Sequence, residues 1–123
     1  MTNILALAVG SLAGGFGRYY LAEFIYHVCG VAFPYGTLAV NALGCFLIGV
    51  FSSLSEKHLI DPAARLLLIV GFCGAFTTFS TFILETANLI KAGEAGLAFI
   101  NVLVSVAIGF VVFYLGILLG EAF

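Results

Sequence analysis

Four long apolar runs, separated by short segments with charged or turn-forming residues, make up most of this chain. They cover about residues 4–26, 34–54, 65–89 and 97–119. Each run is close to the roughly 20 apolar residues that a helix needs to cross a bilayer. With 63% hydrophobic and 8% charged residues, the 123-residue chain lacks the polar surface that a water-soluble protein needs. The sequence predicts an all-α integral membrane protein, with residues 1–123 forming one domain of four transmembrane helices. A barrel is disfavoured because the runs do not alternate between apolar and polar residues.

The positive charges give the chain no clear orientation in the membrane. With four spans, both termini and the second loop lie on one side, and the other two loops lie opposite. Lys57 and Arg65 belong to the first side, whereas Lys91 and the nearer Arg18 belong to the second. Because Lys and Arg near span ends set orientation, this balance allows insertion in either orientation. Four helices leave little room for a pathway, so transport would need at least two copies.

Several function classes lack support in the sequence. The cysteines Cys29, Cys45 and Cys73 have none of the paired spacing of metal sites or disulfide frameworks, so packing is their expected role. The net charge of −2 provides no basic patch for nucleic acid. No phosphate-binding glycine loop or nucleophile elbow occurs. We therefore expect no enzyme activity.

Residues 71–82 differ from an ordinary lipid-facing segment. They lie inside the third apolar run, yet they contain two glycines, four hydroxyl residues and four phenylalanines. Gly74, a weak helix former, and the β-branched Thr77 and Thr78 favour a local break in the helix. Non-helical backbone at membrane depth persists only where protein or a water-filled cavity surrounds it. Carbonyl groups freed by such a break could bind a cation.

Phe76, Phe79 and Phe82 recur every three residues in this segment. Aromatic side chains most often pack in a core, which is the simpler interpretation. The hydroxyl residues between them favour a second one, in which hydroxyl donors and electropositive ring edges replace the water shell of an anion. Glu85, one turn further on, is either an intramembrane acid with a function or an interfacial residue.

The other runs contain polar residues that allow two interpretations. Thr37 and Asn41 share a face of the second helix, and Asn101 and Ser105 share a face of the fourth. Such residues either form interhelical hydrogen bonds or line a pathway. Arg18, in the first helix, either reaches the headgroups or attracts anions at a vestibule.

Glycines spaced four apart predict close contacts between helices in the membrane. The first helix carries Gly10 and Gly14, and the fourth carries Gly116 and Gly120. Small residues at this spacing let two helix backbones approach each other in lipid. Tyr26, near the end of the first run, is expected at the membrane interface.

Three motifs together resemble the Fluc (CrcB-type) fluoride channels. They are Gly-Gly-Phe-Gly-Arg at 14–18, Gly-Thr-Leu-Ala-Val-Asn at 36–41, and the segment 71–82 with its Thr-Thr-Phe-Ser-Thr-Phe end. The resemblance covers all four helices. It implies a multi-pass protein of the bacterial inner membrane that lets fluoride leave the cell passively and so relieves its toxicity. It also implies an antiparallel, dual-topology homodimer with a broken third helix and two pores.

The resemblance also implies roles for single residues of the fluoride pathway. Phe79 and Phe82 would form an aromatic box, and Asn41 would be a donor from the second helix. Ser80 and Thr81 would belong to a polar track, and we place Thr37, Asn101 and Ser105 on the same pathway.

Two further features of the family concern cations and the pore entrance. A structural sodium ion at the dimer centre would be bound by the backbone carbonyls of Gly74 and Thr77. Arg18 would lie at a vestibule.

Two other functions remain possible from the sequence. A small multidrug-resistance-type proton-coupled exporter also has four short helices, but it needs an acid deep in its first helix. Here that helix has Arg18 inside and Glu23 near its end. A membrane protein without transport activity is the other alternative.

Overall fold

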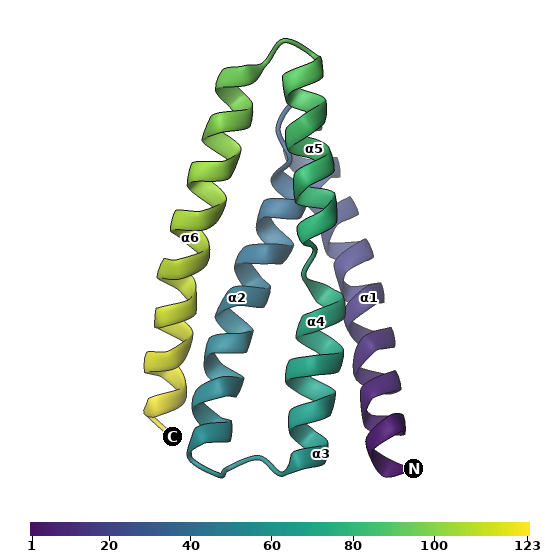
Figure 1. The fold of residues 1–123 in the computed structure, drawn as a ribbon, viewed down its shortest axis with the longest axis vertical. Coiled ribbons are helices and arrows are strands. Elements are labelled where there is room, and N and C mark those ends of the chain that lie inside the picture. The colour runs from purple at the N-terminus through teal and green to yellow at the C-terminus, as the bar shows by residue number, and fades with distance from the viewer.

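The computed structural model describes all 123 residues and is entirely helical (Figure 1). Its elements are α1 (Thr2–Cys29), α2 (Tyr35–Glu56), α3 (Pro62–Arg65), η1 (Leu66–Cys73), α4 (Gly74–Phe76), α5 (Phe79–Lys91) and α6 (Ala95–Glu121). The elements from α3 to α5 form one span, Pro62–Lys91, so the chain has four helices long and apolar enough to cross a membrane. The all-α, four-span prediction is confirmed, and every span end lies within three residues of its expected position.

Neighbouring spans run in opposite directions. In Figure 1 both termini lie at the end of the molecule where α2 connects to α3, and the turn from α5 to α6 lies at the other end. α2 lies between α6 and the third span, and α1 packs against η1 and α4 on the far side. The third span therefore contacts all three other spans. Its η1 and α4 parts contact α1 and α2, and its α5 part contacts α2 and α6.

Glycines bring the spans into direct backbone contact. A Cβ atom on Gly10 would collide with the carbonyl oxygen of Leu67, and one on Gly14 would collide with that of Phe72. On the other side of the bundle, Gly116 meets the backbone of α2 in the same way. The close contacts predicted from the glycine spacing are confirmed.

The outer surface is apolar, as a membrane requires. Phe24 of α1 and Phe99 and Phe110 of α6 are each more than 60% exposed. Because lipid tails are as apolar as these side chains, such exposure has no cost in a bilayer. The chain is a multi-pass membrane protein.

The third span is broken near its middle. α4 ends at Phe76, and the next two residues are extended, with ψ of 157° at Thr77 and 109° at Thr78. α5 then begins at Phe79, and the hydroxyl of Thr78 caps it by accepting a 3.3 Å hydrogen bond from the amide of Thr81. Before the break, η1 is wound as a wider π-helix. The predicted break is confirmed, and it falls on the two threonines rather than on Gly74.

Candidate functional site

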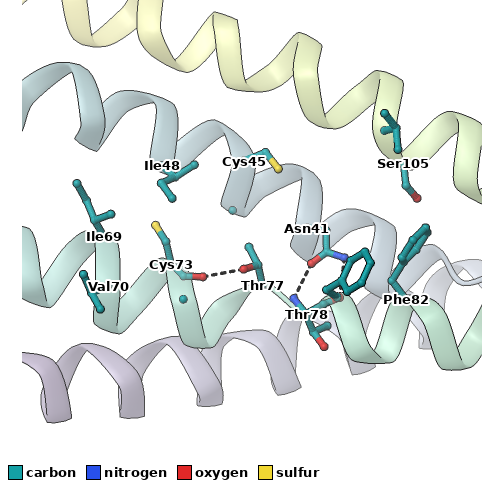
Figure 2. Close-up of a pocket in the computed structure, with 14 residues that line it drawn as sticks. Asn41, Cys45, Ile48, Ile69, Val70, Cys73, Thr77, Thr78, Phe82 and Ser105 are labelled. Carbon is teal, nitrogen blue, oxygen red and sulfur yellow. Dashed lines mark hydrogen bonds between the residues drawn. The ribbon is translucent and has the colours of Figure 1, made fainter.

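An open groove of about 550 Å³ follows the break in the third span (Figure 2). Its walls come from α2, from both halves of the third span and from α6. Six of its lining residues were predicted from the sequence to be functional: Asn41, Gly74, Thr77, Phe79, Phe82 and Ser105. None of the groove's lining residues carries a charge.

Asn41 binds the backbone of Thr78, where the helix is interrupted (Figure 2). The Thr78 amide donates to Asn41 Oδ1 at 2.7 Å, and Asn41 Nδ2 donates to the Thr78 carbonyl at 3.1 Å. Buried backbone groups at membrane depth need such partners. Because an amide NH₂ has two N–H donors, one donor of Asn41 remains beside the groove. The side chain therefore both stabilises the break and lines the groove.

The three regularly spaced phenylalanines, Phe76, Phe79 and Phe82, lie on different sides of the break. Phe76 is 3% exposed and stacks on Phe72, with ring centroids 5.3 Å apart. Phe79 and Phe82 lie beyond the break, with ring centroids 5.9 Å apart and ring planes 40° apart. Phe82 is half-buried, whereas Phe79 is 74% exposed in the single chain. Core packing is thus correct for Phe76, and the other two rings belong to the groove.

The break frees the carbonyls of Gly74 and Thr77 from their usual helical partners. In a continuous helix the Gly74 carbonyl would accept from the Thr78 amide, but that amide donates to Asn41. The Thr77 carbonyl would accept from the Thr81 amide, which instead donates to the Thr78 hydroxyl. Carbonyl oxygens released in this way suit a cation such as Na⁺.

The start of α5 has the opposite polarity. The first amides of a helix lack helical acceptors and carry partial positive charge. At α5 these amides begin at Phe79, beside the groove. One interruption therefore leaves two carbonyls without helical partners next to a helix end with partial positive charge.

The two polar residues of α6 occupy different positions. Ser105 lines the groove, and its hydroxyl donates to Asn101 Oδ1 at 3.4 Å. Asn101 is 1% exposed and donates to the hydroxyl of Thr86, on α5, at 2.9 Å. Asn101 thus joins α5 to α6, while Ser105 faces the groove.

Arg18, Thr37 and Thr81 lie away from the groove. They line a second, open pocket of about 230 Å³ between α1, α2 and α5, which meets the groove at Thr78. Ser80 is exposed and lines neither of these two cavities. The sequence had placed Thr37, Ser80 and Thr81 on one pathway with Asn41, and the structure does not bring these four together within a single chain.

Tyr26 makes polar contacts that sequence reasoning missed. Its hydroxyl donates to Glu85 Oε1 at 2.6 Å and lies 3.3 Å from the hydroxyl of Thr37. Tyr26 and Glu85 are 59 positions apart. The available signal was that all three residues lie toward the same end of three antiparallel spans.

Comparisons with known proteins agree on one family. A family model described as "CrcB-like protein, Camphor Resistance (CrcB)" matches residues 5–117. Three relatives, each named "Fluoride-specific ion channel FluC", align over nearly their whole length. The one from Geobacter sulfurreducens is 48% identical over 119 residues, 96% of each chain. The one from Geotalea uraniireducens is 44% identical over 123 residues, 99% of each chain. The one from Magnetococcus marinus is 45% identical over 120 residues, 97% of this chain and 98% of the relative. With a match of this extent to the family and to its members, the chain belongs to the CrcB-like family.

Proposed function

We propose that this protein is a fluoride-selective channel that lets fluoride leave the bacterial cell passively across the inner membrane. The observation that carries the proposal is the break in the third span, which presents Phe79, Phe82 and Asn41 to one uncharged groove. The relatives' printed name, "Fluoride-specific ion channel FluC", supports fluoride as the ion. Passive flow through a groove of this kind requires no enzyme chemistry.

The groove's chemistry suits a small, strongly hydrated anion. A channel must bind its ion strongly enough to admit it and weakly enough to release it. A lysine or arginine in the groove would favour trapping, and the groove has neither. The remaining donors are the free Asn41 N–H and the start of α5, with the edges of two aromatic rings. The Ser105 hydroxyl also lines the groove, but its proton would have to leave Asn101 Oδ1, a contact of 3.4 Å, to reach an ion.

The working unit in this proposal is an antiparallel homodimer with two pores. A single chain leaves Phe79 74% exposed on an open groove, so it supplies only one wall for an ion. A second copy would supply the opposite wall, and two symmetry-related walls give two pores. The balanced distribution of Lys and Arg between the two sides suits insertion in both orientations.

A sodium ion at the centre of this dimer has a structural role in the proposal. The carbonyls of Gly74 and Thr77 would bind it, since both have lost their helical partners. A Cβ placed on Gly74 meets no neighbouring element within 4 Å, so this side of the break is unobstructed in the single chain.

The exporter alternative is supported less well. Such a protein needs an acid deep in its first helix, and Glu23 of α1 is exposed and near the helix end. The half-buried acid of this chain, Glu85, lies on the third span.

Fluoride efflux from liposomes that contain the purified protein tests the proposal. A fluoride electrode follows release, valinomycin clamps the potassium gradient, and chloride is the competing anion. We expect rapid fluoride release without a proton gradient while chloride is retained. Release that requires a proton gradient would point to the exporter, and folded dimers that release no fluoride would rule out the channel.

A further inference from the structure

Tyr26 and Glu85 form a wall shared by two cavities on the α1 side of the third span. One is the pocket of about 230 Å³ that contains Arg18 and Thr81, here called the inner pocket. The other, here called the outer cavity, measures about 500 Å³ and lies at the loop end of the bundle, beside Pro34 and Glu94. Tyr26 and Glu85 are the two residues that line both.

Two independent contacts fix the Tyr26 side chain in this wall. Its hydroxyl donates to Glu85 Oε1 at 2.6 Å, which joins α1 to α5. Its ring lies against Gly36, the second residue of α2, where a Cβ atom would come within 2.8 Å of Tyr26 Cδ2 and closer still to Cε2. A larger residue at position 36 would therefore displace the ring.

Glu85 depends on Tyr26 for its position. Its second carboxyl oxygen, Oε2, is buried and has no hydrogen-bond partner in the chain. Without the Tyr26 hydroxyl, neither oxygen of this side chain would be bound. The carboxyl group could then rotate away from the wall.

We propose that Tyr26 is a positioning residue that holds Glu85 in place and thereby closes the passage between the outer cavity and the inner pocket. Its part in transport rests on the proposed function, because the passage would admit fluoride from the solution beyond the loops. An ion that passes between the two cavities must first displace this pair of side chains.

The test measures access to the inner pocket by thiol modification. Ala22 lines this pocket, so Ala22→Cys places a thiol there. The protein in liposomes is treated with a charged, membrane-impermeant methanethiosulfonate reagent, and mass mapping separates position 22 from Cys29, Cys45 and Cys73. Adding Tyr26→Phe should raise the reaction rate at position 22 about tenfold, the factor that corresponds to about 1.4 kcal/mol, a typical worth of one hydrogen bond.

A matched variant distinguishes an effect of the Tyr26–Glu85 wall from a general effect of mutation on the protein. Tyr114→Phe, at a position that is 60% exposed and lines neither cavity, should leave the rate unchanged. Gly36→Ala is unsuitable as a second variant, because its Cβ atom would also come within 2.8 Å of the backbone carbonyl oxygen of Ala22, the probe position. Equal rates in the Ala22→Cys protein with and without Tyr26→Phe, both folded, would overturn the proposal.

Fluoride efflux from the same liposomes distinguishes a failure of this inference from a failure of the proposed channel function. We expect Tyr26→Phe to release fluoride faster and still retain chloride, because Phe79 and Phe82 are unchanged. Faster modification with unchanged efflux would overturn the role of Tyr26 in transport. If the unmodified protein releases no fluoride, the proposed channel fails, while the modification rates still decide whether Tyr26 closes the passage.

Discussion

Asn41 and Thr78 bind each other through two hydrogen bonds in opposite directions, one to the Thr78 amide and one to its carbonyl. The side chain of α2 thus replaces the helical acceptor that the Thr78 amide lacks at the break. Thr78 is 8% exposed, so its amide needs a partner within the protein. A side chain of one span therefore stabilises the break in another.

Asn41→Ala should therefore destabilise the fold. It leaves the Thr78 amide without a partner, at a cost of about 1–3 kcal/mol for a buried group. The Thr78 carbonyl, at the N-cap, still accepts the first helical bond of α5. We also expect fluoride efflux to be lost, because Asn41 lines the groove and its free N–H is one of the groove's few donors. Thermal unfolding in detergent and liposome efflux measure the two effects. Asn41→Asp keeps the acceptor for the Thr78 amide and should lose less stability; equal losses in both variants would contradict this account.

The aromatic pair should affect transport without affecting the fold. Phe79→Ile and Phe82→Ile remove the ring edges from the groove, so each should abolish fluoride efflux while dimers still assemble. The stability of the Phe79 variant should change little, because that ring is 74% exposed in the single chain. Liposome efflux and size-exclusion chromatography give the two measurements.

Phe99→Ile is the matched control for the aromatic pair. This α6 ring is 68% exposed and does not line the groove, so its loss should leave efflux unchanged. Normal efflux from folded Phe79→Ile and Phe82→Ile variants would refute the aromatic assignment.

The spans and the break could be predicted because their causes are local in the sequence. A backbone in lipid must satisfy its own hydrogen bonds, so an apolar run of sufficient length becomes a helix. Likewise, β-branched residues lower helix propensity, and here the adjacent Thr77 and Thr78 closely follow Gly74, a weak helix former. The glycine contacts followed from spacing alone.

The pairing of polar groups could not be predicted, because it depends on which helices become neighbours. Nothing near Asn41 in sequence indicates that it binds the backbone of Thr78, 37 positions away. The different environments of Phe76 and of Phe79 and Phe82 could not be predicted either, since the break rotates the residues beyond it relative to Phe76. The contact between Tyr26 and Glu85 was missed because each residue alone looked interfacial.

Gly49 provides a test of the close packing between α2 and α6. A Cβ atom there would collide with the carbonyl oxygen of Phe113, and backbone cannot move aside as a side chain can. Gly49→Ala should therefore lower the free energy of unfolding by about 1–3 kcal/mol. Gly15→Ala is the control, because no atom lies within 4 Å of a Cβ at that position. Thermal unfolding in detergent should separate the two variants, and equal stability would contradict the contact.

Asn101 and Ser105 should give different phenotypes although they share a face of α6. Asn101→Ala removes the bond to Thr86 and should lower stability by about 0.6–2 kcal/mol, the range for hydrogen bonds between membrane helices. Ser105→Ala removes a hydroxyl from the groove and should slow fluoride efflux, and it should lower stability less than Asn101→Ala does, because its bond to Asn101 Oδ1 is long, at 3.4 Å. Unfolding and efflux measured on both variants decide the assignment; a Ser105 variant with normal efflux would place the pathway elsewhere.

The sodium proposal can be tested by removing the ion rather than by mutation, because its ligands would be backbone atoms. The carbonyls of Gly74 and Thr77 lack their helical partners and need another positive group nearby. Dimers purified and reconstituted with N-methylglucamine in place of sodium should therefore be less stable and should release fluoride more slowly, since that cation is too large to be bound by carbonyls at a helix break. Returning sodium should restore both properties, whereas potassium, a larger ion, should restore them less well. Stability and efflux that are the same in sodium and in N-methylglucamine would mean that the carbonyls are satisfied by protein or water, and that the break exists for the groove alone.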